Sequence, residues 1–291
     1  MKIKKVLVAY KRSTYQKYLI EQKDPNYVKL FQKKHPTTNR FLPAHKNHLR
    51  SLEMVKSVLK KRKIQFKAQP RSWAFDEKDF DLIVSVGGDG TFLDASRHVL
   101  HKTILGINSS PFDSVGRFCS INAEQFDQSL DQLIKNQAKS VVLSRLKVEL
   151  DHNVLQPVLN DVLICNENPA TTSRYLLQIG RKREEQKSSG IWVSTASGSS
   201  AAIRGAGGIL LPLEDKRFQF LVREPYHQPN QVPTLISEVL TNAQSLVVYS
   251  KMREGCLFLD GSRRKEEFRF GSKLKISAKG PKLKSWNLTS V

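Results

Sequence analysis

Short apolar runs and helical patterns alternate along the first part of the chain. Apolar runs of this kind predict buried parallel strands, and they cover residues 4–10, 64–68, 81–86 and 104–108. Between them, a one-faced helix that ends near Lys63 is predicted from the spacing of Leu49, Leu52, Val55, Val58 and Leu59, and an apolar helix is predicted at residues 92–100. Strands that alternate with helices favour a parallel sheet with crossover helices, which is an α/β domain.

The rest of the chain has a different pattern. The polar stretch from Lys11 to His48 shows no clean period, so we expect an irregular insertion with at most one helix. After a helix that carries Phe126 and Leu130, strand-like runs separated by Gly, Pro, Asn and Asp predict a β-rich domain. These runs are residues 141–150, 158–165, 175–179, 191–195, 218–222, 246–249, 256–259 and 268–276. We therefore predict an α/β domain at residues 1–121 and a β-rich domain at residues 122–291.

The composition is that of a globular protein. The 291 residues are 39% hydrophobic and 26% charged, enough for a sizeable core. The sequence contains no apolar run of about 18 residues, so no membrane-spanning helix is predicted. The first residues lack the pattern of a secretory signal, so a cytoplasmic protein is expected. Three scattered cysteines predict neither a disulfide framework nor a zinc site, and we assign no metal ligands.

The net charge of +21 is unevenly distributed. Residues 1–81 hold 21 Lys and Arg against 7 acids. Such a field attracts nucleic acid, an anionic membrane surface or phosphorylated metabolites, or it only keeps the surface solvated. Because no zinc-finger spacing, aromatic RNA-binding strand or basic heptad array accompanies the charge, nucleic acid is not an expected partner.

The turn Gly87-Gly88-Asp89-Gly90-Thr91 joins a predicted strand to a predicted helix. Its glycines permit positive φ and a close approach of the backbone to a ligand, and the helix start offers N–H groups to an anion. It is neither a Walker loop nor a complete dinucleotide fingerprint. Asp89 is placed to deprotonate or orient a hydroxyl, or to hold a phosphate-bound metal; the alternative is a tight turn in which Asp89 caps the next helix.

Several segments carry a resemblance to a known family. Residues 87–93 resemble the signature loop of NAD kinases, of diacylglycerol- and sphingosine-type lipid kinases and, more distantly, of phosphofructokinases. Residues 106–108 (Gly-Ile-Asn), 159–162 (Leu-Asn-Asp-Val) and 194–201 (Ser-Thr-Ala-Ser-Gly-Ser-Ser-Ala) resemble further NAD kinase segments in the same order. Residues 186–190, 222–225, the insert 109–114 and the N-terminal insertion look most like animal mitochondrial NAD kinases, so the resemblance covers essentially the whole chain.

This resemblance implies the NAD kinase/diacylglycerol kinase-like fold, with the substrate in a crevice between an α/β and a β-rich domain. It implies transfer of the ATP γ-phosphoryl to the 2′-hydroxyl of the NAD adenosine ribose, which yields NADP. Asp89 matches the catalytic aspartate, and Mg²⁺ is expected through the phosphates. The implied phosphate- and ATP-binding residues are Gly87, Gly88, Gly90, Thr91 and Arg117, and the implied NAD-binding residues are Asn160, Asp161, Ser197, Ser200 and Ala201. A homodimer is implied as well.

The chain departs from the family pattern at four positions: Asp161 replaces Glu, Ser189 replaces Asp, Ala202 replaces Tyr and Ala196 replaces Pro. The changes at Ser189 and Ala196 are shared with the mitochondrial type, whereas those at Asp161 and Ala202 leave the preference for NAD or NADH open. Arg117 stands where Phe is common, and a guanidinium there would pair with a phosphate. From spacing alone, the Asn160–Asp161 pair also fits an ordinary strand-entry turn. The final residues, 282–291, are predicted to be strand or tail, which puts the family's returning helix in doubt.

Two other functions remain open at this stage. A lipid kinase of the same superfamily would use the basic surface to dock on a membrane. A non-catalytic relative would bind the dinucleotide without turning it over.

Overall fold

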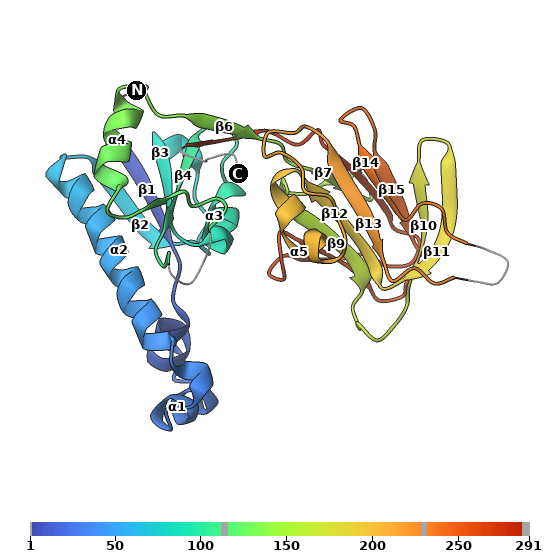
Figure 1. Ribbon diagram of the computed structural model, residues 1–291, viewed down its shortest axis with the longest axis horizontal. Helices are drawn as coiled ribbons and strands as arrows, with labels where there is room; N and C mark the ends of the chain where they lie inside the picture. Colours follow the sequence, from blue (N-terminus) through green and yellow to red (C-terminus); the bar gives the residue numbers. More distant parts are fainter. Residues whose placement is uncertain (1, 112–115, 228–231, 287–291) are drawn as a thin grey trace. The chain divides into compact units, whose positions relative to one another are not determined.

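The computed structural model describes residues 2–111, 116–227 and 232–286 (Figure 1). The chain divides into two compact units. Unit 1 extends to Val141 and includes the chain again from Lys284, whereas unit 2 comprises Val142–Leu283. An α/β unit is thus followed by a β-rich unit, which confirms the predicted fold class.

Unit 1 is built on a largely parallel sheet with the strand order β2-β1-β3-β4-β19-β6, in which β5 also pairs with β4. The strands are β1 (Lys5–Tyr10), β2 (Gln65–Pro70), β3 (Leu82–Gly87), β4 (Thr103–Asn108), β5 (Ile121–Asn122), β6 (Ser140–Leu143) and β19 (Leu283–Trp286). Every residue of β3 and β4 is buried, because helices cover both faces of such a sheet and its central strands have no solvated side. The four strands predicted in this part of the sequence are therefore confirmed.

The helices of unit 1 include a long amphipathic one, α2. The helical segments are η1 (Tyr15–Glu21), α1 (Pro25–Gln32), η2 (Pro36–Thr38), α2 (Phe41–Lys61), η3 (Glu77–Asp79), α3 (Asp89–Ser96) and α4 (Phe126–Ile134). The buried face of α2 consists of His45, His48, Leu52, Val55 and Leu59, whereas Leu49 is exposed. The helix starts earlier than expected because two histidines continue its apolar face at helical spacing.

The prediction for residues 11–48 was wrong. This stretch is mostly helical, and it forms η1, α1, η2 and the start of α2. The Asp24 carboxylate accepts hydrogen bonds from the N–H groups of Asn26 and Tyr27 and so caps α1. Stacked rings, among them Tyr18 on Tyr27 at 4.3 Å between centroids, hold these segments together. Neither η1 nor α1 has a buried residue, so no aliphatic period marked them in the sequence.

The boundary between the compact units falls at Val141, not near Ile121. Helix α4 belongs to unit 1 because Phe126, Leu130 and Leu133 are buried in its core. The chain also returns to unit 1 at its end, where β19 pairs in parallel with β4. Of the two readings for residues 282–291, strand is right for the described part.

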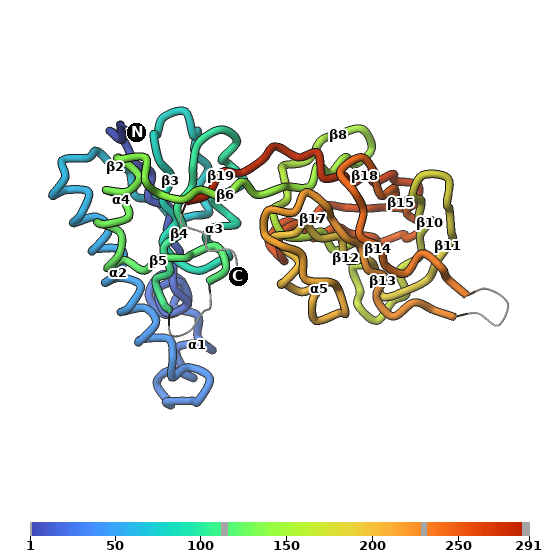
Figure 2. Tube along the Cα trace, turned by 45° about the horizontal axis from the view of Figure 1, so that its top comes forward, coloured from blue at the N-terminus to red at the C-terminus, as the bar shows by residue number. Residues whose placement is uncertain are grey.

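The described part of unit 2 forms two antiparallel sheets (Figure 2). One has the order β11-β10-β15-β18-β7-β8 and the other the order β14-β13-β12-β9-β16-β17. Their strands are β7 (Lys147–Leu150), β8 (Asn153–Val154), β9 (Asp161–Asn166), β10 (Ser173–Ile179), β11 (Lys182–Ser188), β12 (Gly190–Thr195), β13 (Phe218–Arg223), β14 (Ser237–Leu240), β15 (Leu246–Ser250), β16 (Gly255–Leu259), β17 (Lys265–Glu267) and β18 (Lys273–Ser277). Inward residues of both sheets, such as Leu177 and Val193, share one core, which is the packing of a β-sandwich.

Two short helical segments follow β12 in unit 2, η4 (Ser197–Ser200) and α5 (Ala202–Gly205). Cys165 and Cys256 face each other across β9 and β16 with their sulfurs 3.9 Å apart, and both are free thiols, as is the buried Cys119. No helix in the described part of the chain is long and apolar enough to cross a membrane.

Candidate functional site

The Gly-rich turn lies at the carboxyl end of β3, where a parallel sheet presents ligand sites. Gly88 caps helix α3 and Asp89 is its first residue. The expected positive φ is not observed at these glycines: Gly88 has a φ of −116°, and Gly87 and Gly90 also lie outside the left-handed region. Gly87 is instead required by close packing, because a Cβ there would lie 2.2 Å from Thr91 Oγ1.

The Asp89 carboxylate is held by a segment that follows it by 28 residues. Its Oδ2 accepts a hydrogen bond from the Arg117 N–H at 2.9 Å, and its Oδ1 accepts one from the Phe118 N–H at 2.8 Å. These bonds lead away from α3 and do not support the alternative that Asp89 caps its own helix. The carboxylate is half-buried at the helix N-terminus, where the dipole stabilises its charge.

Thr91 is fully buried and is part of the packing of the turn. Its hydroxyl oxygen accepts a hydrogen bond from Arg71 Nη1 at 2.9 Å. Arg71 also pairs through Nε with Asp94 at 3.0 Å, and Asp94 pairs with Arg97 at 2.6 Å. Sequence reasoning missed Arg71 and Asp94; the signal was that Arg71 follows β2 directly, at the same edge of the sheet as Asp89.

Arg117 follows Gly116, whose φ of +59° is a conformation that favours glycine. The Arg117 guanidinium is half-buried; desolvation lowers its pKa, whereas the negative charge of Asp89 raises it. Phe118 is buried and stacks on Phe92 at 5.1 Å between ring centroids. Arg117 is therefore brought close to Asp89, as a phosphate ligand would need to be. Residues 112–114 of the predicted insert lie outside the described residues.

His48 lies on the face of α2 that packs on the sheet and also went unnoticed in the sequence. It is 1% exposed, and its Nδ1 is 3.0 Å from Ser109 Oγ, which follows the end of β4. Burial, together with the positive charges of Lys11 and Arg71, lowers the pKa of His48 to about 3. A neutral imidazole and two cationic side chains thus accompany the Gly-rich turn at this edge.

Unit 2 carries a second group of candidate residues at the start of β9. Asp161 is 6% exposed. Its pKa is raised to about 7, mainly by burial and to a lesser extent by the negative charge of Asp260. Asn160 precedes it, and its side-chain Oδ1 is buried with no hydrogen-bond partner in the described part of the chain. An unpaired buried acceptor of this kind is costly unless a ligand supplies a donor.

The Ser-rich segment after β12 packs directly on this pair. The Ser197 hydroxyl donates to the Leu159 carbonyl at 2.9 Å, and a Cβ on Gly198 would lie 2.1 Å from the Asn160 carbonyl oxygen. Ser197 is buried, whereas Ser200 is exposed and Ala201 half-buried. The structure therefore brings Asn160, Asp161 and Ser197 together, with Ser200 and Ala201 on the same segment, while Asp89, Arg117 and the Gly-rich turn form their group in unit 1.

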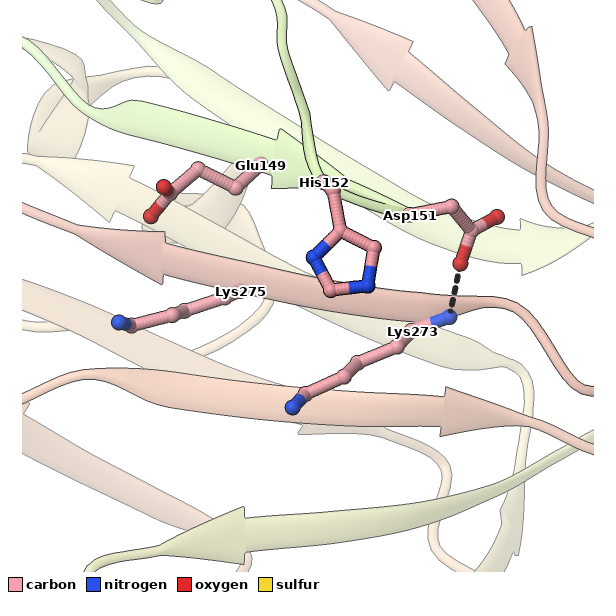
Figure 3. Close-up of a pocket in the computed structure, with 5 residues that line it drawn as sticks. All are labelled: Glu149, Asp151, His152, Lys273 and Lys275. Carbon is pink, nitrogen blue, oxygen red and sulfur yellow. Dashed lines mark hydrogen bonds between the residues drawn. The ribbon is translucent and has the colours of Figure 1, made fainter.

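A pocket of about 190 Å³ in unit 2 includes none of the predicted residues (Figure 3). Glu149, Asp151, His152, Lys273 and Lys275 line it. Asp151 Oδ1 accepts a hydrogen bond from the Lys273 N–H at 2.7 Å, and Glu149 pairs with Lys147, which lowers the pKa of Glu149. These charges stabilise the neighbouring strands, so we assign the pocket no function. The described residues also contain no group of three His, Cys, Asp or Glu side chains arranged to bind a metal.

Comparison with known proteins places this geometry in a family. The family model described as "ATP-NAD kinase N-terminal domain" matches residues 27–138, which include the Gly-rich turn. The "Probable NADH kinase" of Oryza sativa subsp. japonica is 32% identical over 262 residues, which cover 81% of this chain and 80% of the relative.

Solved structures agree at the level of the fold. An NAD kinase from Archaeoglobus fulgidus in complex with ATP superposes with a TM-score of 0.70 at 18% identity, over 98% of this chain and 94% of that chain. Yeast NADH kinase complexed with NADH superposes with a TM-score of 0.73 at 14% identity, over 99% of this chain and 84% of that chain. With the two groups of site residues described above and a relative that matches most of its length, the chain belongs to the NAD kinase family.

Proposed function

We propose that this protein is an ATP-dependent NAD(H) kinase, which transfers the γ-phosphoryl group of ATP to the 2′-hydroxyl of the adenosine ribose of NAD⁺ or NADH. The observation that carries the proposal is the position of Asp89, a half-buried carboxylate at the start of α3 whose two oxygens are fixed by backbone N–H groups. The relatives support it, since the rice protein bears the name of an NADH kinase.

In the reaction, the 2′-oxygen of the ribose forms a bond to the γ-phosphorus, and the bond from that phosphorus to the β,γ-bridging oxygen breaks. The proton of the hydroxyl passes to Asp89 and then to solvent, and ADP leaves with the electron pair of the broken bond. Because such a transfer depends on positioning and charge neutralisation, the N–H groups of Arg117 and Phe118 contribute by holding the carboxylate in place.

The donor phosphates are assigned to unit 1. The backbone of Gly87, Gly88 and Gly90 and the guanidinium of Arg117 are the proposed contacts, whereas the buried Thr91 acts by shaping the turn. Mg²⁺, when bound, would neutralise charge on the phosphates. Since the described residues offer no cluster of three protein ligands, the donor set fits a metal held mainly by the phosphates, with Asp89 as the nearby carboxylate.

The dinucleotide is assigned to unit 2. Asn160 and Asp161 are the proposed contacts to ribose and adenine, and Ser197, Ser200 and Ala201 belong to the same binding segment. The buried, unpaired Oδ1 of Asn160 supports this, because a ligand N–H or O–H would satisfy it.

The test is a coupled assay with ATP, Mg²⁺ and either NAD⁺ or NADH. Asp89→Asn is expected to lower kcat by about a hundredfold or more, the usual contribution of a general base, with a smaller change in KM. Asp79→Asn, on an exposed aspartate of the same unit, serves as the control and is expected to leave kcat unchanged. An Asp89→Asn variant with wild-type kcat would overturn the proposal. Phosphorylation of diacylglycerol instead would identify a lipid kinase, and tight NAD binding without turnover a non-catalytic relative.

We also propose that the protein is a homodimer located in the cytoplasm. We further propose that it is most similar to the animal mitochondrial type, on the basis of residues 186–190, residues 222–225, the insert 109–114 and the N-terminal insertion. Light scattering of the purified protein tests the dimer, and microscopy of a fluorescent fusion tests the location. A sequence tree that includes the plant NADH kinases tests the third point.

A further inference from the structure

One carboxylate in unit 2 holds the backbone of residues 159–161, which we call the dinucleotide motif because Asn160 and Asp161 are the proposed contacts to NAD(H). Asp260, directly after β16, is 8% exposed. Its Oδ1 accepts hydrogen bonds from the N–H groups of Leu159 at 3.0 Å and Asn160 at 2.6 Å, and its Oδ2 accepts from Leu159 at 3.1 Å. Its own N–H donates to the Asp161 carbonyl at 2.9 Å. Three consecutive residues of the motif are thus bonded to a single residue about 100 positions later in the chain.

The backbone conformation of Asp260 would suit a glycine better, so the aspartate side chain must contribute a compensating interaction. Its φ is +52°, in the left-handed region that only glycine adopts freely, and Gly261 beside it has a φ of +96°. An aspartate in this conformation is less favourable than a glycine. The compensating interactions are the hydrogen bonds that its carboxylate accepts from the N–H groups of Leu159 and Asn160.

The carbonyl side of the motif is held from the opposite direction. The Ser194 hydroxyl donates to the Asn160 carbonyl at 3.2 Å, and the Thr195 N–H donates to the same oxygen at 2.9 Å. The Asn160 N–H donates to Asp260, and its carbonyl accepts from Ser194 and Thr195 at the end of β12. These hydrogen bonds fix the backbone of Asn160 on both sides. The direction of its side chain, whose Oδ1 is buried and unpaired among the described residues, follows from that position.

Asp260 also acts on Asp161 through its charge. Asp161 pairs in register with Ser194 of β12, and the packed segment after β12 contributes the uncharged Ser197 and Gly198. Burial raises the pKa of Asp161, and the negative charge of Asp260 raises it further. Burial and this negative charge both favour the protonated form of the Asp161 carboxyl.

We propose that Asp260 is a positioning residue for the dinucleotide: its carboxylate fixes the backbone of Leu159–Asp161 so that the Asn160 amide meets the adenosine. Held against Asp161 by its own N–H at 2.9 Å, its negative charge adds to burial in favouring a protonated Asp161 carboxyl that donates a hydrogen bond to the ligand. The identity of the ligand rests on the proposed function, whereas the hold of Asp260 on the motif does not.

Two substitutions separate the hydrogen bonds from the charge. Asp260→Ala removes both, and we expect it to raise the Kd and KM for NAD(H) about tenfold or more, with a smaller change in kcat, because Asn160 loses its fixed position. Asp260→Asn keeps one acceptor oxygen and suits the left-handed backbone, so it should restore most of the affinity. Without the charge, however, it should lower the pKa of Asp161, measured by carboxyl ¹³C NMR in the ligand-free protein.

The chain offers a matched control in Asp151. It also has a positive φ, +46°, and its carboxylate also accepts a backbone N–H across strands, from Lys273 (Figure 3). Its carboxylate holds Lys273 of β18 and not the backbone of Leu159–Asp161. Asp151→Ala and Asp151→Asn should therefore leave the affinity for NAD(H) and the pKa of Asp161 unchanged, and their stability gives the purely structural cost of losing such a bond.

The outcomes are distinct. The proposal fails if Asp260→Ala binds NAD(H) like Asp151→Ala, or if the pKa of Asp161 in Asp260→Asn equals the wild-type value. The NMR comparison also decides the matter if Asp260→Ala does not fold. If the wild-type protein binds no NAD(H), the proposed function fails, while the effect of Asp260→Asn on Asp161 still tests the hold of Asp260 on the motif.

Discussion

A methyl group added at Gly198 tests whether the Ser-rich segment must lie directly on the dinucleotide motif. An ideal Cβ at this position would lie 2.1 Å from the Asn160 carbonyl oxygen and 2.5 Å from its carbonyl carbon. Normal contacts between such atoms begin more than 1 Å further apart, so one backbone must move. The Asn160 backbone cannot move freely, because Asp260 and β12 hold both of its sides.

The expected cost follows from this geometry. Overpacking of a buried site costs about 1–3 kcal/mol, and the loss of backbone freedom in the unfolded chain returns about 0.4–1 kcal/mol on a Gly→Ala change. We therefore expect Gly198→Ala to lower the free energy of unfolding by about 1–2 kcal/mol and to weaken NADH binding, because the displaced carbonyl belongs to Asn160. Urea denaturation and calorimetric titration with NADH measure the two effects.

Gly205→Ala is the matched control, because a Cβ at that position of the following helix α5 would meet no other segment of the described chain within 4 Å. It should be neutral or stabilise the protein by up to about 1 kcal/mol. If Gly198→Ala and Gly205→Ala have the same stability and the same NADH affinity, the close approach of the two segments does not determine the binding site.

Three further predictions concern buried charges. Asp94→Asn leaves the guanidinium of Arg71 without its carboxylate in a site that is only 9% exposed at Asp94, so we expect a loss of about 2–3 kcal/mol in urea denaturation; a change below 0.5 kcal/mol contradicts this. Glu77 accepts hydrogen bonds from the N–H groups of residues 100–102, and Glu77→Ala should cost about 2 kcal/mol, whereas equal melting temperatures would argue against it. The raised pKa of Asp161 means that its ionisation opposes folding. The free energy of unfolding of the wild type, relative to that of Asp161→Asn, should therefore fall as the pH rises from about 4 to about 7, by at most about 1.4 kcal/mol per pH unit. A difference that stays constant over this pH range refutes the shift.

The strands of unit 1 could be predicted because burial leaves a simple mark on the sequence. Strands β3 and β4 are covered on both faces, so their sequences are continuous apolar runs. The helices between residues 11 and 48 leave no such mark, because aromatic rings and histidines form their contacts. A period defined by aliphatic residues cannot detect a helix face of that composition.

The domain boundary was missed for a related reason. The predicted boundary at residue 121 assigned the helix that carries Phe126 to the β-rich domain, but the compact units are defined by where side chains pack. Phe126 and Leu130 of α4 are buried in unit 1, and Trp286 returns to the same core from the end of the chain. Packing between segments so far apart in sequence cannot be inferred from local composition.

For the proposed site, the motifs supplied candidate residues but not the structural reason for each of them. The glycines of the turn were expected to supply positive φ, whereas Gly87 is required by the packing of Thr91. Motif spacing also gave no indication of Asp260 or Arg71, because their partners lie about 100 and 20 positions away.

Both groups of site residues follow one physical pattern. The Asp89 carboxylate accepts N–H groups of Arg117 and Phe118, and the N–H groups of the Asn160 motif are accepted by Asp260. In each case a carboxylate and a distant backbone segment fix one another, and the geometry is set by hydrogen bonds that short motifs do not contain. We therefore expect a chain with the Gly-rich turn and the Asn-Asp pair to retain the proposed chemistry only if it also keeps two further residues. These are Gly116, which precedes the two N–H groups that bind Asp89, and Asp260, whose carboxylate binds the N–H groups of the other pair.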